Sequence, residues 1–147
     1  MSVSYRVKID GLEKLLNQLS PEKSKLIQDK ILENTARVMA EEVANLSPVR
    51  TGQLMRSWSY RKISDSKYIV GSKAEYASFV EFGTRPHVIY PRRARALRFE
   101  VDGEVVFARR VHHPGTPAQK FVAQALRLVQ NRFRQFANNI INEVMKK

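Results

Sequence analysis

The sequence predicts an α+β fold, in which a small antiparallel sheet packs with two long amphipathic helices and carries a protruding basic hairpin. Two long segments, one starting near residue 21 and one near residue 117, place apolar side chains at helical spacings of three and four. Shorter segments between them alternate apolar and polar residues, which is typical of half-buried strands. The 147 residues, 43% hydrophobic and 27% charged, suit a single domain over residues 1–147.

The first part of the chain is expected to hold a strand, a brief helix and then a long helix. Residues 3–9 alternate apolar and polar side chains, and Asp10 can cap a brief helix that ends near residue 19. Ser20 suits the N-cap of the long helix, Pro21 suits its first position, and Pro48 ends it near residue 47. The apolar stripe of this helix consists of Leu26, Ile27, Ile31, Val38, Met39, Val43 and Leu46.

Short elements are expected to follow the long helix. Thr51 suits the N-cap of a short helix that runs through Trp58. Strands at 59–63 and 68–71 flank a turn at residues 64–67. Residues 74–82 are ambiguous between helix and strand, and we expect a helical turn that Gly83 closes as a C-cap.

A hairpin is expected next, because Asp102-Gly103 is a typical two-residue turn between strands. Residues 84–95 before it are expected to form an irregular basic loop, and residues 104–111 the return strand. The expected pairs across the hairpin are Val101 with Glu104, Phe99 with Val106, Leu97 with Ala108 and Arg98 with Phe107.

The last helix is expected to open at Pro117. Its apolar stripe consists of Val122, Leu126, Val129, Phe133, Phe136, Ile140 and Val144. Such a stripe can cover the sheet of its own chain or form a coiled-coil seam, and we favour the first because the other elements need cover.

Charge is the unusual property of this composition. Lys and Arg number 26 against 14 Asp and Glu, so the formal net charge is +12. Such an excess favours a polyanionic partner, either nucleic acid or an acidic protein surface, although a solvated basic surface without a specific partner has the same composition. The absence of cysteine excludes disulfides and thiol chemistry and fits a reducing cytosol. We expect no secretion signal and no membrane partner.

Arginine is concentrated in the basic loop and the hairpin. Six arginines form the candidate contact set: Arg92, Arg93, Arg95, Arg98, Arg109 and Arg110. With Arg85 and His87 they would make a basic patch on one projecting element, residues 85–111. Because the guanidinium fork donates to phosphate and carboxylate alike, the patch could hold a nucleic-acid backbone without sequence preference or the acidic surface of an adjacent subunit. Both interpretations stay open at this point.

Other polar residues favour structural roles. Arg50 could grip a phosphate or a neighbour's carboxylate, but the corner at Thr51 and Gly52 better suits a turn into a helix. Glu81 has no second acid, histidine or metal ligand suggested nearby for general-base catalysis, so a salt bridge to Arg50 or Arg85 is expected. The neighbouring side chains Phe79 and Phe82 are expected in the core.

The histidines and the motif inventory do not predict catalysis. His87, His112 and His113 could ligate zinc, but adjacent side chains at a strand end point to opposite faces. We expect residues 113–117 to form a rigid turn with a helix cap. No phosphate-binding loop, nucleophile elbow or paired-acid motif is present, so no enzyme, cofactor or metal site is expected.

Three short motifs in fixed order carry a resemblance to a known family. They are Ser47-Pro48-Val49-Arg50-Thr51-Gly52, Tyr76-Ala77-Ser78-Phe79-Val80-Glu81-Phe82-Gly83-Thr84 and His113-Pro114-Gly115-Thr116-Pro117-Ala118. From about Val38 to Leu126 the chain resembles the head–tail joining proteins of long-tailed bacteriophages, also called neck or tail-completion proteins. The resemblance implies the same architecture, with fold-determining positions at Thr51, Gly52, Tyr76, Glu81, Phe82, Gly83, Thr84, His113, Pro114 and Gly115.

The resemblance also implies a structural role in the virion. Such a protein would form a homo-oligomeric ring that completes the tail and joins it to the head connector, with the genome passing through. Expected partners are further copies, the connector, tail-tube or tail-terminator proteins, and packaged DNA in transient, non-specific contact. The expected location is the neck of the virion, after synthesis in the bacterial host cytoplasm. The alternative is a sequence-independent nucleic-acid-binding protein that acts alone, and a hydrolase ranks below both.

Overall fold

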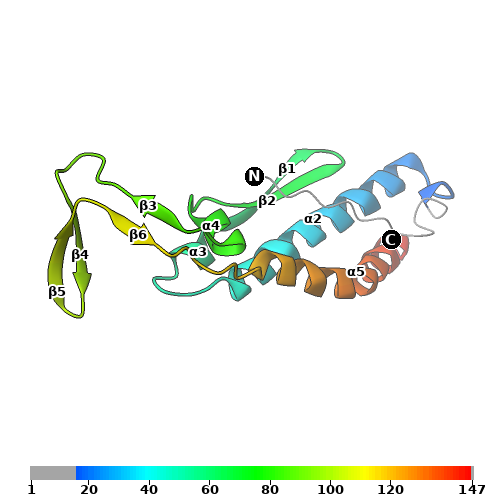
Figure 1. The fold of residues 1–147 in the computed structure, drawn as a ribbon. Helices are drawn as coiled ribbons and strands as arrows, with labels where there is room; N and C mark the ends of the chain where they lie inside the picture. Colours follow the sequence, from blue (N-terminus) through cyan, green and yellow to red (C-terminus); the bar gives the residue numbers. More distant parts are fainter. Residues whose placement is uncertain (1–15, 147) are drawn as a thin grey trace. The chain divides into compact units, whose positions relative to one another are not determined.

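Helix α2 (Pro21–Leu46) has the ends that the sequence predicts (Figure 1). Ser20 Oγ accepts a hydrogen bond from Lys23 N at 3.4 Å, and Ser47 ends the helix with extended backbone before Pro48. The structure, a computed structural model, describes residues 16–146. The strand expected at 3–9 and the cap expected at Asp10 lie outside the described residues.

The chain divides into two compact units, Met1–Ala77 with Phe121–Lys147 as the first and Ser78–Lys120 as the second. The expectation of a single domain over residues 1–147 stays a prediction. The basic element expected at 85–111 lies within the second unit.

The core of the first unit lies between α2 and α5 (Phe121–Met145), which pack against each other. Ile27 and Ile31 of α2 are buried with Ala137 and Val144 of α5. Helix α5 therefore covers apolar surface of its own chain, but it packs on α2 rather than on the sheet, where it was expected. The α2 stripe is wrong at one position, because Leu26 is 47% exposed. Small side chains complete the interior instead, namely Ala36, Ala40 and Ala125.

The start of α5 corrects the prediction that Pro117 opens the last helix. The helix begins at Phe121, because Lys120 has a φ of +52°, a left-handed conformation that a right-handed helix cannot include. Pro117 lies in the irregular segment before it.

The helix α3 (Gln53–Arg56) is shorter than expected and has a different N-cap. Gly52, at a φ of +73°, occupies the N-cap position that was expected for Thr51. Thr51 Oγ1 nevertheless accepts a hydrogen bond from Gln53 N at 3.4 Å. Trp58, expected inside this helix, instead begins strand β1.

Strands β1 (Trp58–Ser64) and β2 (Lys67–Ser72) form the expected antiparallel ribbon, which packs on α2. Trp58 holds one end of this ribbon to the helices. Its indole N–H donates to Ser47 Oγ at 3.0 Å, and its ring meets Phe121 edge-on at a centroid distance of 6.0 Å. Ser47, only 3% exposed, in turn donates to the carbonyl oxygen of Val43 at 2.7 Å.

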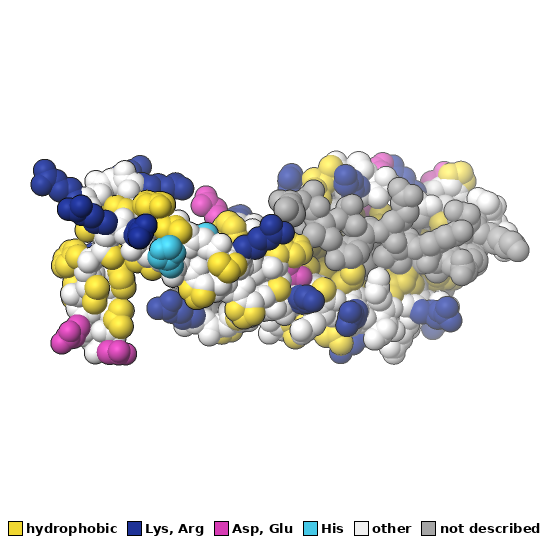
Figure 2. Space-filling model, viewed as in Figure 1, with side chains coloured by type: hydrophobic (Ala, Val, Ile, Leu, Met, Phe, Trp, Pro, Cys, Tyr) yellow, Lys and Arg dark blue, Asp and Glu magenta, His cyan; other side chains and the backbone are white. Residues whose placement is uncertain are grey.

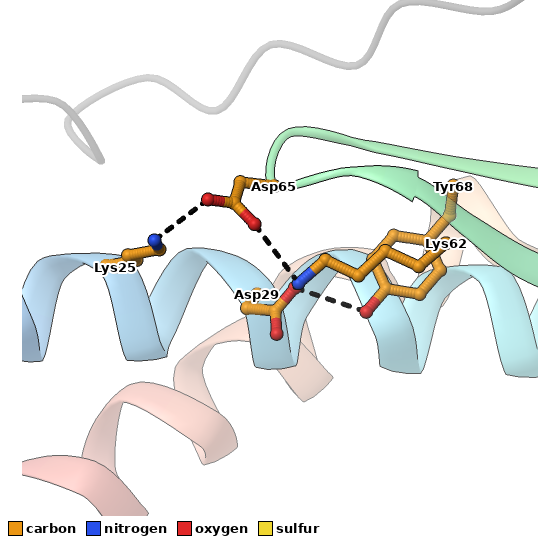
Figure 3. Close-up of polar contacts among 5 residues, drawn as sticks. All are labelled: Lys25, Asp29, Lys62, Asp65 and Tyr68. Carbon is orange, nitrogen blue, oxygen red and sulfur yellow. Dashed lines mark hydrogen bonds and ion pairs between the residues drawn. The ribbon is translucent and has the colours of Figure 1, made fainter.

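A cluster of charged side chains holds the other end of the ribbon to α2 (Figure 3). Lys62 Nζ lies 2.7 Å from Asp29 Oδ1, and Asp65 lies 2.8 Å from Lys25 Nζ. The hydroxyl of Tyr68 donates to Asp29 at 3.1 Å. The hydrogen bond from Lys62 lowers the pKa of Asp29 and raises that of Lys62, and the hydrogen bond from Lys25 lowers the pKa of Asp65. Burial, followed by the bond to Asp29, raises the pKa of Tyr68.

The second unit contains most of helix α4 (Ala77–Phe82) and strands β3 (His87–Ile89), β4 (Leu97–Val101), β5 (Glu104–Ala108) and β6 (Val111–His113). Gly83, at a φ of +72°, follows α4 as the expected left-handed C-cap. The β4–β5 hairpin has the predicted register throughout, from Leu97–Ala108 to Val101–Glu104.

Two predictions for this unit are wrong. The segment 84–95 was expected to be an irregular loop, but part of it forms strand β3, which pairs with β6. The return strand expected at 104–111 is interrupted after Ala108 and resumes at Val111. The described strands thus form three separate antiparallel ribbons, β1–β2, β3–β6 and β4–β5, and the α+β class is confirmed. Between residues 16 and 146, no helix combines the length and hydrophobicity that spanning a bilayer requires.

Candidate interaction surface on an arginine-rich arm

Residues 84–116 of the second unit form two consecutive strand pairs, in which β3 and β6 enclose the β4–β5 hairpin, and we call this segment the arm. Thr84 pairs with Thr116 and His87 with His113, and this register continues to Ile89 opposite Val111. The register then breaks, because residues 90–96 lie opposite only Arg109 and Arg110 before β4 pairs with β5. The outgoing side of the arm therefore carries a long bulge at the point where the return side has two arginines.

Five arginines meet at this break, and we call them the arginine bulge: Arg92, Arg93, Arg95, Arg109 and Arg110. All five side chains are exposed. The sixth arginine of the predicted set, Arg98, lies on β4 opposite Phe107 and is also exposed. Within residues 16–146, none of the six takes part in an ion pair or a side-chain hydrogen bond. Their donors are free for an external partner.

The charge on the arm is polarised along its length. Glu100, Asp102 and Glu104 lie at the turn end of the β4–β5 hairpin, which we call the acidic tip. Figure 2 shows basic side chains at one end of this hairpin, acidic ones at the other and apolar ones between them. Four residues of rise in β4, roughly 13 Å, separate the strand's two ends, so the acidic tip is too far from the bulge to neutralise it within one arm.

The base of the arm is closed by a structure that we call the Gly-Thr clasp, formed by Gly83-Thr84 and Gly115-Thr116. Thr84 N donates to Thr116 O at 3.0 Å, and Thr116 N donates to Thr84 O at 3.1 Å. Each glycine lies against the opposite strand, because a Cβ on Gly83 would collide with Thr116 O and one on Gly115 with Thr84 O. The clasp thus needs glycine at both positions for space as well as for their φ values of +72° and +87°.

The clasp corrects one part of the prediction for residues 113–117, because none of them caps a helix and α5 begins only at Phe121. Thr116 is committed to the pairing with Thr84, and their hydroxyls also lie 3.1 Å apart. His113 supports the turn, since its Nδ1 accepts from Gly115 N at 3.0 Å. Its ring stacks on His87 with centroids 5.0 Å apart. Pro114, which separates His113 from Gly115 in the chain, is exposed.

The predicted core role of the aromatic residues around α4 is wrong. Phe79 and Phe82, which were expected in the core, are 59% and 52% exposed. Residues of a six-residue helix at spacing three share one face, so Phe79 and Phe82 present a common apolar surface. Glu81 is only 6% exposed, and its expected salt bridge to Arg50 or Arg85 stays a prediction.

At the corner after α2, the turn is contacted by an arginine for which no role was predicted. Arg56 Nη2 donates to the carbonyl oxygen of Thr51 at 3.0 Å, and the Arg56 side chain lies over Gly52. Arg50 is exposed. Arg56 thus takes a structural part at this corner, while Arg50 could still reach a neighbouring molecule.

Sequence reasoning missed the clasp and the β3–β6 pairing. The available signal was the repeated Gly-Thr dipeptide at residues 83–84 and 115–116, each following a bulky or rigid residue. Among residues 16–146 there is no group of three or more histidine or carboxylate side chains that could hold a metal ion. What the arm offers chemically is exposed charge and exposed apolar surface.

Comparison with known proteins finds a family match that covers part of the first unit and not the arm. The family model described as "Bacteriophage HK97-gp10, putative tail-component" matches residues 10–83, about half of the chain. The match ends at the first glycine of the clasp, so the arm lies beyond it. No curated protein and no solved structure matches the chain. The matched segment covers α2, the corner, the β1–β2 ribbon and α4, and on this match the chain belongs to the HK97-gp10-like family of bacteriophage tail components.

Proposed function

We propose that this protein is a structural, non-catalytic subunit of the phage neck. Copies of it form a ring that completes the tail and joins it to the head connector around the DNA path. That the protein is a component of the phage tail follows from its family membership. The ring, the neck position and the DNA path are our proposal.

The observation that carries the proposal is the arginine bulge in a tail-family chain. Five exposed guanidinium groups without intramolecular ion pairs among residues 16–146 lie at one point of the arm. A ring that lets a genome pass needs electrostatic contact that is weak and independent of sequence, because tight binding would obstruct ejection. Arginines on an exposed bulge suit such contact, and Tyr90 is the one aromatic residue among residues 90–96.

Virions of the encoding phage provide the decisive test. We expect deletion of this gene to yield filled heads and tails that remain unjoined, or tails with incomplete ends. Labelled protein is expected at the neck in micrographs of intact wild-type particles. Finding the protein only in infected-cell lysate, and not in purified virions, would overturn the proposal.

DNA binding tests the role of the bulge separately. The wild-type chain is expected to bind duplex DNA weakly, with an affinity that falls steeply with salt. Changing Arg92, Arg93 and Arg95 together to Ser should reduce the salt slope by roughly 0.9 for each phosphate that the variant no longer neutralises. The matched control changes three exposed arginines of the first unit that also lack ion pairs among residues 16–146, Arg61, Arg127 and Arg134, and is expected to change binding less.

The same free arginines keep a second candidate function under test, a nucleic-acid-binding protein that acts alone. It predicts a stable, stoichiometric DNA complex of a monomer or dimer at physiological salt. The neck proposal predicts weak association under these conditions. Native mass measurements with duplex DNA at low and at physiological salt distinguish the two.

A further inference from the structure

The β4–β5 hairpin has an apolar face that residues 16–146 leave partly exposed. In the observed register, side chains of the pairs Leu97–Ala108 and Phe99–Val106 lie on the same face, and the pair Val101–Glu104 continues this face to the turn. Phe99, Val106 and Val101 are 36%, 37% and 46% exposed. A two-stranded ribbon alone is at best marginally stable in water, so burial of this face would stabilise it.

The two ends of this same hairpin carry opposite charge. The acidic tip has three carboxylates, and the arginine bulge has five guanidinium groups. None of these eight side chains has an ion-pair partner within the part of the chain that the structure describes. Since the ends cannot reach each other within one arm, a partner that matches both must carry positive and negative charge at the same separation as this arm does.

A second copy of the chain meets that requirement. We propose that arms of two copies pair in antiparallel orientation, with the acidic tip of each against the arginine bulge of the other. The apolar faces, formed by Leu97, Phe99, Val101, Val106 and Ala108, lie between them. This inference goes beyond the proposed function, because a reciprocal contact of this kind joins two copies, and a ring needs a further, head-to-tail contact between subunits.

Charge sets the orientation of this pairing, and apolar burial gives it affinity. A parallel alignment would place like charges together, which disfavours it. The hairpin is small compared with a standard interface of about 800 Å² per partner, so pairing in solution should be weak and dependent on concentration. Five arginines face three carboxylates, so positive charge remains for DNA after pairing.

A charge-swap experiment with the full chain tests the proposal. One variant reverses the tip by Glu100→Lys and Glu104→Lys, and another reverses the bulge by Arg92→Glu, Arg93→Glu and Arg95→Glu. Each variant alone is expected to self-associate at least about tenfold more weakly than wild type in sedimentation velocity, because the tip of one copy then repels the bulge of the other. An equimolar mixture is expected to recover association, because each reversed end meets its complement.

Matched controls separate this contact from general effects of charge or hydrophobicity. Reversal of Arg127 and Arg134, exposed on α5, should leave self-association unchanged. Phe99→Ser should weaken association, whereas Phe107→Ser, on the opposite face of the same ribbon and 66% exposed, should not. A mixture of tip and bulge variants that associates no better than either variant alone would overturn the proposal, as would a Phe99 variant with wild-type association.

The outcomes distinguish this inference from the proposed function. If the chain is found at the neck of virions but the charge swap shows no rescue, the arm contact is wrong and the neck role stands. If rescue is observed but the protein is missing from virions, the arm contact stands and the neck role is wrong.

Discussion

Thr84 and Thr116 exchange two backbone hydrogen bonds, of 3.0 and 3.1 Å, across 32 residues of sequence. The pair closes the base of the arm, and the glycine before each threonine lies against the carbonyl oxygen of the opposite threonine. Two of the three motifs that characterise the sequence are therefore partners in one clasp. Their joint role explains why each motif contains Gly-Thr.

Replacing either clasp glycine should open the base of the arm. Gly83→Ala and Gly115→Ala each combine backbone strain of about 1–2 kcal/mol with a collision against a backbone carbonyl. Hydrogen exchange at the Thr84 and Thr116 amides should accelerate in both variants. Gly103→Ala is the matched control, because Gly103 has a φ of +84° but open space for a Cβ. Equal acceleration in all three variants would show that strain alone, and not close approach, decides the effect.

Acid should weaken the attachment of the β1–β2 ribbon to α2. Asp29 and Asp65 have pKa values lowered below their ordinary 3.8, so their stabilising contribution is present above that value and is lost as the pH falls through their folded-state pKa values. The pKa of Lys62 is raised above 10.5, so its contribution is complete below pH 10.5 and is lost only at more alkaline pH. Denaturant unfolding between about pH 2 and pH 7 should show a smaller acid-induced decrease in stability for Asp29→Asn than for wild type.

Ser47→Ala should destabilise the first unit by about 1–3 kcal/mol. The substitution removes the acceptor of the Trp58 indole N–H at a buried position. Trp58 is the only tryptophan, so its fluorescence reports both unfolding and any change of its environment. Ser59→Ala, an exposed serine on the same strand, is expected to have no comparable effect. If both variants unfold at the same denaturant concentration as wild type, the hydrogen bond contributes nothing measurable.

Neighbouring residues on α2 should differ sharply in their effect on stability. Ile27→Ala is expected to cost about 2–5 kcal/mol, because this side chain is 0% exposed between the two long helices. Leu26→Ala, at 47% exposure, should change the free energy of unfolding by only about 0.5 kcal/mol. Thermal or denaturant unfolding of both variants compares them directly. Similar decreases in stability would mean that Leu26 is covered by another molecule or by another copy.

The arginine bulge should be dispensable for folding. Changing Arg92, Arg93 and Arg95 together to Ser should leave unfolding cooperative, with each surface substitution costing about 0.5 kcal/mol or less. Circular dichroism during thermal unfolding measures this. Absence of a cooperative transition in the triple variant would assign these arginines a structural role.

Local sequence signals predicted well what depends on neighbouring residues. Ser20, Pro21 and Pro48 set the ends of α2, and Asp102-Gly103 sets the β4–β5 register, because caps and tight turns act over a few residues. The candidate arginines were predicted to come together by that same hairpin, and the register places five of them at one break. Their partner stays a prediction.

The features that the sequence did not reveal depend on contacts between distant residues. Gly83 was correctly expected as a C-cap, but its close approach to Thr116 depends on a strand more than 30 residues away. Ala36, Ala40, Ala125 and Ala137 were overlooked because the predicted stripes were built from large apolar residues, whereas close helix packing also buries small ones. Pro117 is a helix-start signal that Lys120 overrides through its left-handed backbone.

The clasp also gives the arm the geometry of an inserted segment, whose two ends lie side by side. Because Thr84 and Thr116 are hydrogen-bonded neighbours, residues 85–115 leave and return to the same place on the backbone, as an inserted segment does when its ends coincide. The family match stops at Gly83, the last residue before this segment's first anchor. Related tail proteins could therefore gain, lose or exchange an arm at this point while keeping α2 and the β1–β2 ribbon unchanged. The Gly-Thr clasp is therefore also the position at which the arm of one phage protein could be grafted onto the subunit of another.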